Sequence, residues 1–162
     1  MIVNRQGRVR VSIASLNGFL AAARKHLRLP ADSLTVALVT DQQIARWNAA
    51  YRGKKKPTDV LSFPADGLRP KNSRRAVGSK TPRLVSRPAK SNSSNSSSYL
   101  GDIAIAPAVA RRNAVRFGRT FDAEMRILIL HGVLHLLGYN HETDTGEMDR
   151  RETQLRRKLG LA

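Results

Sequence analysis

Apolar residues recur along this chain at two kinds of spacing, and each spacing predicts a kind of secondary structure. Between Ile13 and Leu27 they recur every three or four residues, which is typical of a helix with one buried face. Further helices are predicted over about 41–51, 107–116, 121–137 and 144–159. Short runs of apolar and β-branched residues predict strands over 33–39, 59–63 and 99–105, and a weaker alternation predicts one over 2–11.

These elements follow one another in the order strand–helix–strand–helix–strand–strand–helix–helix–helix. The order predicts an α/β (α+β) fold in which a small mixed four-stranded sheet is flanked by helices. The chain has 162 residues, of which 41% are hydrophobic, so it is long enough to bury a core. We expect a single domain over residues 1–162.

Residues 66–98 interrupt this pattern. They are rich in Pro, Ser, Asn and basic residues, and they contain almost no bulky apolar or aromatic side chain. Such a segment cannot bury enough apolar surface to offset the entropy lost when it becomes ordered. We therefore expect a flexible, basic, Ser/Asn-rich insertion within the domain, between two neighbouring strands.

The composition adds a large excess of positive charge. The chain has 29 Lys and Arg against 12 Asp and Glu, which gives a formal net charge of +17. Part of the excess lies in the 66–98 insertion, where its simplest role is to keep that segment solvated, but the rest of the chain is also basic. A polyanionic partner is expected, and RNA is the leading candidate.

Cysteine is absent, so the chain has no disulfide partner, and any metal site must be built from His, Asp and Glu. The first residues hold no apolar run of signal-peptide length. The most apolar stretch, residues 127–139, is too short and too interrupted to cross a bilayer. We expect a cytoplasmic protein without a membrane partner.

Three of the four histidines lie within one short segment, and their spacing predicts a metal site. His131 and His135 are four residues apart, which places both imidazoles on one face of the predicted helix. Gly138 can adopt a positive φ and end that helix, so that the chain folds back and presents His141 to the same point. Three imidazoles around one ion are typical of a catalytic zinc site with its fourth position open to water. Nickel, cobalt or iron would also suit these ligands.

The alternative is a pair of core histidines bonded to backbone carbonyls, with an unrelated third. This helix is apolar on nearly every side, and two buried imidazoles on one face need partners that an ion supplies together. The spacing His-x3-His-x2-Gly-x2-His is also that of the metzincin proteases. Those enzymes carry a catalytic Glu directly after the first His, whereas this chain has Gly132, which argues against peptide hydrolysis by that mechanism.

Three segments, in the same order, resemble motifs of the YbeY family of bacterial metal-dependent endoribonucleases, which mature ribosomal RNA. They are HGVLHLLGYNH at 131–141, RGKKKPTDVLSFP at 52–64 and LGDI at 100–103. Met148 and Glu152 also occupy positions where the family has Met and Glu in its last helix. The resemblance covers the chain apart from the 66–98 insertion.

The resemblance implies a function and a set of site residues. It implies that His131, His135 and His141 bind one Zn²⁺ and that Arg52 is the functional arginine. It further implies a single-strand-specific endoribonuclease that acts on ribosomal RNA of the small subunit, at the 3′ end of 16S rRNA, and in ribosome quality control. One departure is Asn140, where the family usually has Asp; an amide cannot take up a proton, so the general base stays open.

These residues suggest a mechanism. The metal would polarise a phosphodiester oxygen or lower the pKa of its water, while Arg52 holds a non-bridging oxygen. Basic RNA-binding residues are expected at Lys54, Lys55 and Lys56, and supporting groups around the site at Asp59, Asp102 and Asn140. The simpler reading is that Arg52 and the lysines face solvent and that the two aspartates cap turns. Because aromatic residues are few, readout of base identity is expected to be weak.

Two rival functions remain. A metallohydrolase acting on a substrate other than RNA would need a carboxylate base near the metal. A non-catalytic ribosome-assembly protein would close a structural zinc with a fourth protein ligand, for which Asp144, Glu142 and His26 are available.

Overall fold

The computed structural model describes residues 1–65, 99–140 and 144–161. In these ranges the elements are β1 (Ile2–Asn4), α1 (Ile13–Leu27), β2 (Leu34–Leu38), α2 (Asp41–Arg52), β3 (Val60–Pro64), β4 (Gly101–Ile105), α3 (Pro107–Arg116), α4 (Phe121–Leu136) and α5 (Glu147–Lys158). The predicted insertion at 66–98 lies outside the described residues, so its flexibility stays a prediction.

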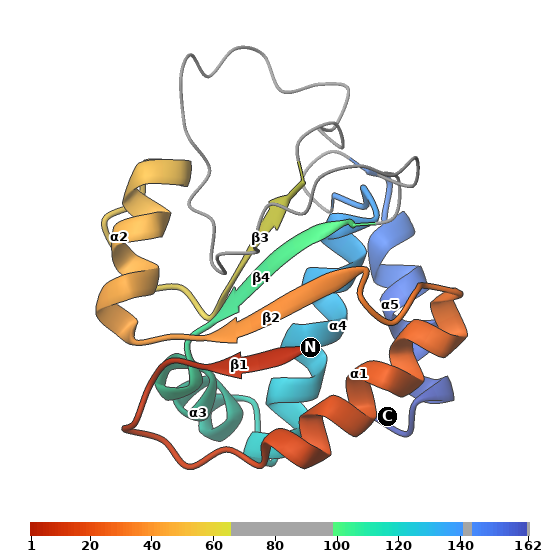
Figure 1. Cartoon of the computed structure of the whole chain (residues 1–162), viewed down its shortest axis with the longest axis horizontal. Coiled ribbons are helices and arrows are strands. Elements are labelled where there is room, and N and C mark those ends of the chain that lie inside the picture. The colour runs from red at the N-terminus through yellow and green to blue at the C-terminus, as the bar shows by residue number, and fades with distance from the viewer. Residues whose placement is uncertain (66–98, 141–143, 162) are drawn as a thin grey trace, which may run out of the picture.

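The strands form one sheet in the order β1-β2-β4-β3 (Figure 1). β1, β2 and β4 are parallel, and β3 pairs antiparallel with β4 at the edge. The predicted α/β fold with a small mixed four-stranded sheet is thereby confirmed.

The two faces of the sheet carry separate cores. On one face, side chains such as Val36 and Ile103 pack against α1 and α4, together with Met148 and Leu155 of α5. On the other face, residues such as Ala104 and Phe63 pack against α2. This alternation along each strand determines which face, and therefore which helix, every polar strand residue can reach.

Two elements, β1 and α5, differ most in length from the prediction, for reasons that lie in side-chain hydrogen bonds. β1 ends at Asn4, well short of residue 11, because the Gln6 side chain bonds both backbone groups of Val9 at 2.9 Å and closes a loop. α5 begins at Glu147, not near 144, because the Asp144 carboxylate accepts hydrogen bonds from the backbone N–H groups of Gly146 and Met148. These short-range polar bonds compete with regular pairing.

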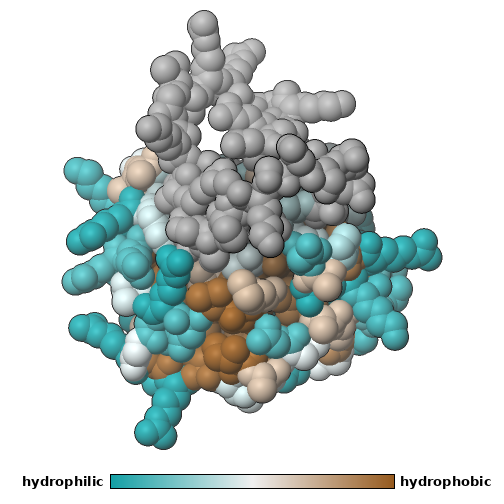
Figure 2. Space-filling view, in the orientation of Figure 1, coloured by the Kyte–Doolittle hydropathy of each residue, from teal (hydrophilic) through white to brown (hydrophobic). Residues whose placement is uncertain are grey.

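None of the helices in the described residues combines the length and the hydrophobicity needed to cross a bilayer. Figure 2 shows hydrophilic side chains extending from both flanks of the molecule, with a hydrophobic area in the lower middle of the visible face.

Candidate metal centre

The C-terminal half of α4 brings His131 and His135 together. Their ring centroids are 4.7 Å apart and the rings are nearly perpendicular. The Nε2 atom of His135 lies 3.1 Å from the Nε2 atom of His131. Most of the helix is buried, but both imidazoles stay partly exposed, so the two nitrogens converge at an accessible point.

Glu152 of α5 fixes the orientation of His131. Its Oε2 atom lies 2.8 Å from Nδ1 of His131, and a second ion pair joins Glu152 to Arg156. A hydrogen on Nδ1 donates to this carboxylate and leaves the Nε2 lone pair directed at His135. A carboxylate bonded to the far nitrogen of a histidine is the usual support of a metal ligand.

Glu152 is buried, and burial alone would raise its pKa. The hydrogen bond from His131 and the positive charges of His131 and Arg156 outweigh that effect and hold the pKa of the carboxyl below its ordinary value. The carboxylate is therefore ionised at neutral pH, as an acceptor for the Nδ1 hydrogen of His131 must be.

The donor geometry of this pair fits a metal ion. Two imidazole nitrogens on one tetrahedral zinc, each bonded at about 2.05 Å, are separated by about 3.3 Å. The observed 3.1 Å between the two Nε2 atoms is close to this value. His131 and His135 could therefore hold one ion with little rearrangement.

The third predicted ligand, His141, lies outside the described residues. Among the residues that are described, no group of three or more His, Cys, Asp or Glu is arranged to hold a metal ion. What leads up to His141 agrees with the prediction: Gly138 has φ +94°, and its N–H donates to the carbonyl of His135. The helix thus ends where a positive φ allows the chain to turn back. The three-histidine site stays a prediction.

A pocket of about 360 Å³ opens beside the histidine pair. It is formed by the end of α2, by 58–64 including β3, by α4 and by the segment that follows α4. Its lining residues are Tyr51, Arg52, Thr58, Asp59, Val60, Leu61, Ser62, Pro64, His131, His135, Tyr139 and Asn140. The fold therefore gathers Arg52, Asp59 and Asn140, which are distant in sequence, around the two histidines.

Arg52 reaches this pocket because it is the last residue of α2. Gly53 follows in the left-handed conformation, with φ +70°, and ends the helix. The buried Asn48 then holds the next turn by donating from Nδ2 to the carbonyl of Lys56 at 2.7 Å. Lys54, Lys55 and Lys56 are exposed in this loop and do not line the pocket.

The two predicted supporting aspartates lie in different places. Asp59 lines the pocket, where its carboxylate accepts from the backbone N–H of Val60 and from Nδ2 of Asn113, both at 2.9 Å. Asp102 pairs across the sheet with Phe63 and so projects from the α2 face, away from α4. Its carboxylate accepts from the Tyr99 hydroxyl at 2.5 Å. Asp102 therefore anchors the start of β4 and is not in contact with the histidine pair.

Gly132 has a structural reason to be glycine. A Cβ atom at this position would come within 2.8 Å of Ile103 Cγ2, because β4 packs directly against α4 here. The carbonyl of Gly132 also accepts a hydrogen bond of 3.1 Å from the Ser62 hydroxyl. The catalytic Glu of the metzincins therefore has no room at this position.

Glu152 is a candidate site residue that sequence reasoning missed, since the family resemblance gives its position but not its contact with His131. A signal was present, since Glu152 lies four residues after Met148 and three before Leu155, on the buried stripe of an otherwise highly charged helix. A carboxylate in an apolar stripe requires a partner. The sequence did not indicate that the partner is His131.

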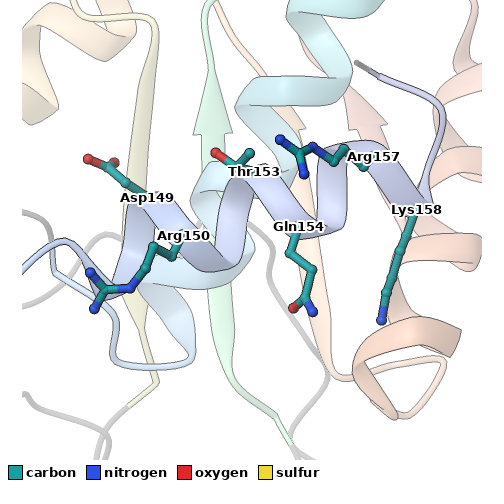
Figure 3. A pocket seen from close by; sticks show the side chains of 6 residues that line it. All are labelled: Asp149, Arg150, Thr153, Gln154, Arg157 and Lys158. Carbon is teal, nitrogen blue, oxygen red and sulfur yellow. The ribbon is translucent and has the colours of Figure 1, made fainter.

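A second depression, of about 500 Å³, lies on the outer surface of α5 (Figure 3). Its side chains form two rows along the helix: Asp149, Thr153 and Arg157 on one, and Arg150, Gln154 and Lys158 on the other. All six are exposed, and they include no buried polar group. We interpret this depression as the ordinary groove between two rows of helix side chains.

Comparisons with known proteins agree with the motifs. The family model described as Endoribonuclease YbeY matches residues 2–160. A relative named Endoribonuclease YbeY from Koribacter versatilis is 37% identical over 161 residues, covering 99% of this chain and 86% of its own. Another of that name, from Sinorhizobium medicae, is 38% identical and covers 86% and 71%.

A solved structure has the same fold. The solution structure of TM1509 from Thermotoga maritima superimposes with a TM-score of 0.58 at 25% identity, and the match covers 98% of this chain and 89% of that one. Together with the histidine pair, its supporting carboxylate and the adjoining arginine, these matches identify the chain: it belongs to the YbeY family of endoribonucleases.

Proposed function

We propose that this protein is a zinc-dependent endoribonuclease that cuts single-stranded RNA. In the cell we place it in the cytoplasm, on ribosomal RNA of the small subunit, where it matures the 3′ end of 16S rRNA and contributes to ribosome quality control. Family membership supports the endoribonuclease activity. The zinc dependence and the ribosomal role are our inference.

The observation that carries the proposal is the convergence of two imidazole nitrogens at 3.1 Å, with a buried carboxylate behind one of them. Zinc bound by His131, His135 and His141 would supply a Lewis acid and lower the pKa of a bound water. Glu152 holds the His131 ring in the orientation that directs its Nε2 atom at the pocket. This support leaves the ring little freedom to turn away.

Arg52 is the group best placed to hold the substrate phosphate. Arg52 lines the same pocket as the histidines, and its guanidinium presents several N–H donors in a planar fork. A forked contact to a non-bridging oxygen strengthens as negative charge builds during cleavage. Lys54, Lys55 and Lys56, exposed on the adjoining loop, would hold the flanking backbone through salt-dependent contacts.

The aromatic residues that line the pocket favour a single strand. Tyr51, which is 45% exposed, and Tyr139 both line it and can stack on unpaired bases. Phe63 is buried beneath Tyr51, with the ring centroids 5.4 Å apart, so it supports Tyr51 and does not itself meet a base. Stacking of this kind accepts any base, consistent with weak sequence readout.

The rival functions are less well supported. A peptidase would need a carboxylate where Gly132 packs against Ile103. A structural zinc would need a fourth protein ligand, yet the Asp144 carboxylate is engaged in capping α5 and His26 is exposed in the last turn of α1. Glu142 lies outside the described residues.

The proposal is tested with purified protein and an unstructured RNA oligonucleotide. Cleavage should stop when a chelator removes the metal and return when zinc is restored. His135→Ala should abolish cleavage, whereas His26→Ala, which changes an exposed histidine, should leave it unchanged. Cleavage by His135→Ala at the wild-type rate, or full activity in chelator, would refute the metal mechanism.

A further inference from the structure

The end of the molecule opposite the metal centre carries a second concentration of positive charge, which we call the arginine pole. It comprises Arg5, Arg8 and Arg10 of the β1–α1 loop together with Arg111, Arg112, Arg116 and Arg119 of α3 and the turn after it. All of them are exposed. The mechanism proposed above uses none of them.

The fold brings these two segments to one end. The loop begins where the Arg5 N–H donates to the carbonyl of Leu38, just before α2, and Arg112 of α3 pairs with Asp41 at the start of α2. The loop ends at α1, where Ser15 bonds Asp122 at the start of α4, directly after α3. Figure 1 shows the loop running past α3, and hydrophilic side chains project from the same lower-left corner in Figure 2.

The acidic groups at this end are already engaged. Asp41 pairs with Arg112, Glu124 with Arg119 and Asp122 with Arg126, at 2.7 to 3.0 Å. Among the described residues, the other arginines of the pole make no ion pair with a carboxylate. They are Arg5, Arg8, Arg10, Arg111 and Arg116. The pole therefore presents positive charge that no described acidic residue neutralises.

An exposed aromatic ring holds two of these arginine side chains in place. Phe117 is 52% exposed, and the guanidinium groups of Arg116 and Arg119 lie 5.6 and 5.1 Å from its ring centroid. Glu124, buried beneath, holds Arg119 from the other side at 2.9 Å. The ring and the carboxylate thus pre-organise two guanidinium groups, which lowers the entropy lost when they bind phosphate.

The residue type points to phosphate. Every cation of the pole is arginine, whose forked guanidinium binds phosphate oxygens in pairs, whereas the loop beside the metal centre uses lysines. α4 separates the two regions: at 1.5 Å per residue, Phe121 at its start is about 15 Å from His131 and about 21 Å from His135. One RNA molecule could reach both.

We propose that the arginine pole binds the phosphate backbone of an RNA helix that flanks the single strand cut at the metal centre. The pole supplies exposed guanidinium groups, and the exposed ring among them, Phe117, already lies against two of these groups, which suits a duplex recognised by its backbone. This inference rests on the proposed function in naming RNA as the ligand, but its test does not depend on cleavage. It implies that the enzyme selects a helix–single-strand junction and not merely an exposed strand.

The test is binding of a blunt RNA duplex, measured by fluorescence anisotropy over a range of salt concentrations. Arg111→Gln/Arg116→Gln removes two exposed charges that no described ion pair uses. It should weaken binding at least ~10-fold and lower the slope of log K against log salt by about two. The matched control, Lys25→Gln/Lys158→Gln, removes two exposed charges from the ends of α1 and α5 and should bind within about twofold of wild type.

A cleavage assay adds a second readout. Arg111→Gln/Arg116→Gln should cut an unstructured strand at the wild-type rate but lose the lower KM for the same strand joined to a hairpin. Thermal unfolding checks that the variants are folded.

Several outcomes would overturn the inference. If the arginine variant binds the duplex as tightly as wild type, the pole is not the duplex-binding site. If both variants lose affinity equally, the loss reflects only the lower net charge. Displacement of the duplex by an acidic polypeptide of equal charge at lower concentration would make the pole a protein-docking surface. Duplex binding at the pole by a protein that cuts no RNA would instead refute the proposed function alone.

Discussion

The two ends of α4 differ in how their polar side chains are arranged. At the C-terminal end, two histidines converge on one point, and a buried glutamate from another helix fixes one of them. At the N-terminal end, Arg119 and Arg126 pair with Glu124 and Asp122, in a region where further arginines face solvent. The first arrangement defines a point, which suits one small ion. The second spreads charge over a surface, which suits an extended polyanion.

Substitution of Arg52, beside the histidine pair, should have the largest effect on activity. Arg52→Gln removes the guanidinium from the pocket and should lower kcat/KM on single-stranded RNA by about 10²-fold or more, because a charge that stabilises the transition state is lost. Arg46→Gln, in an exposed position of the same helix outside the pocket, is the control and should change kcat/KM by less than about twofold. Equal losses of kcat/KM in both variants would show that Arg52 contributes only to the overall positive charge.

Two buried glutamates, Glu124 of α4 and Glu152 of α5, allow a matched comparison. Glu152→Gln should weaken zinc affinity about 10- to 100-fold, because the support of His131 loses its charge. Glu124→Gln removes the other buried carboxylate, the partner of Arg119, and should cost about 1 kcal/mol of stability while leaving zinc affinity unchanged. Competition with a chromophoric chelator gives the affinity, and denaturant unfolding gives the stability. Unchanged zinc affinity in Glu152→Gln would contradict the assigned role.

Replacing two helix glycines by alanine should change the stability of the fold in opposite directions. Gly132→Ala places Cβ against Ile103 and should destabilise the fold by about 1–3 kcal/mol, whereas the cost should shrink in an Ile103→Ala background. Gly18→Ala, at an exposed position of α1 where a Cβ would meet no atom within 4 Å, should stabilise the fold by about 0.5–1 kcal/mol. Stabilisation by both substitutions would show that β4 does not restrict residue 132.

The smallest expected effect concerns the start of α5. Hydrogen bonds from the backbone N–H groups of Met148, Gly146 and Glu147, with the charge of Arg150, outweigh desolvation and lower the pKa of the Asp144 carboxyl. A lowered pKa in the folded state stabilises the protein above the unfolded pKa of about 4, and this stability is lost as the pH falls through the folded value.

Asp144→Asn should therefore lower the Tm slightly at pH 7, and the difference from wild type should vanish in acid. Asp32→Asn, in the exposed turn before β2, controls for the loss of one negative charge. If the difference in Tm persists unchanged in acid, the ionised Asp144 carboxylate is not what stabilises the start of α5.

The fold was largely predictable because local signals agree with tertiary packing. The helix predicted over 107–116 has the same bounds as α3, since Pro107 at its first turn marks the start. The i, i+4 spacing predicted correctly that His131 and His135 lie together. The spacing could not reveal that Glu152 supports His131, that Ile103 excludes a side chain at residue 132, or that Asp102 projects from the opposite face. Each of these depends on contacts between segments far apart in sequence, and on a sheet order that local pattern leaves open.

The central claim is that a single ion is held by the histidines at the C-terminal end of α4. Metal content by elemental analysis tests it most directly, in protein purified with zinc present and then dialysed. Wild type and His26→Ala should retain about one zinc per chain, and His135→Ala should retain almost none, because a catalytic site of this kind has three protein ligands. Full zinc content in His135→Ala, or none in the wild-type protein, would contradict the account.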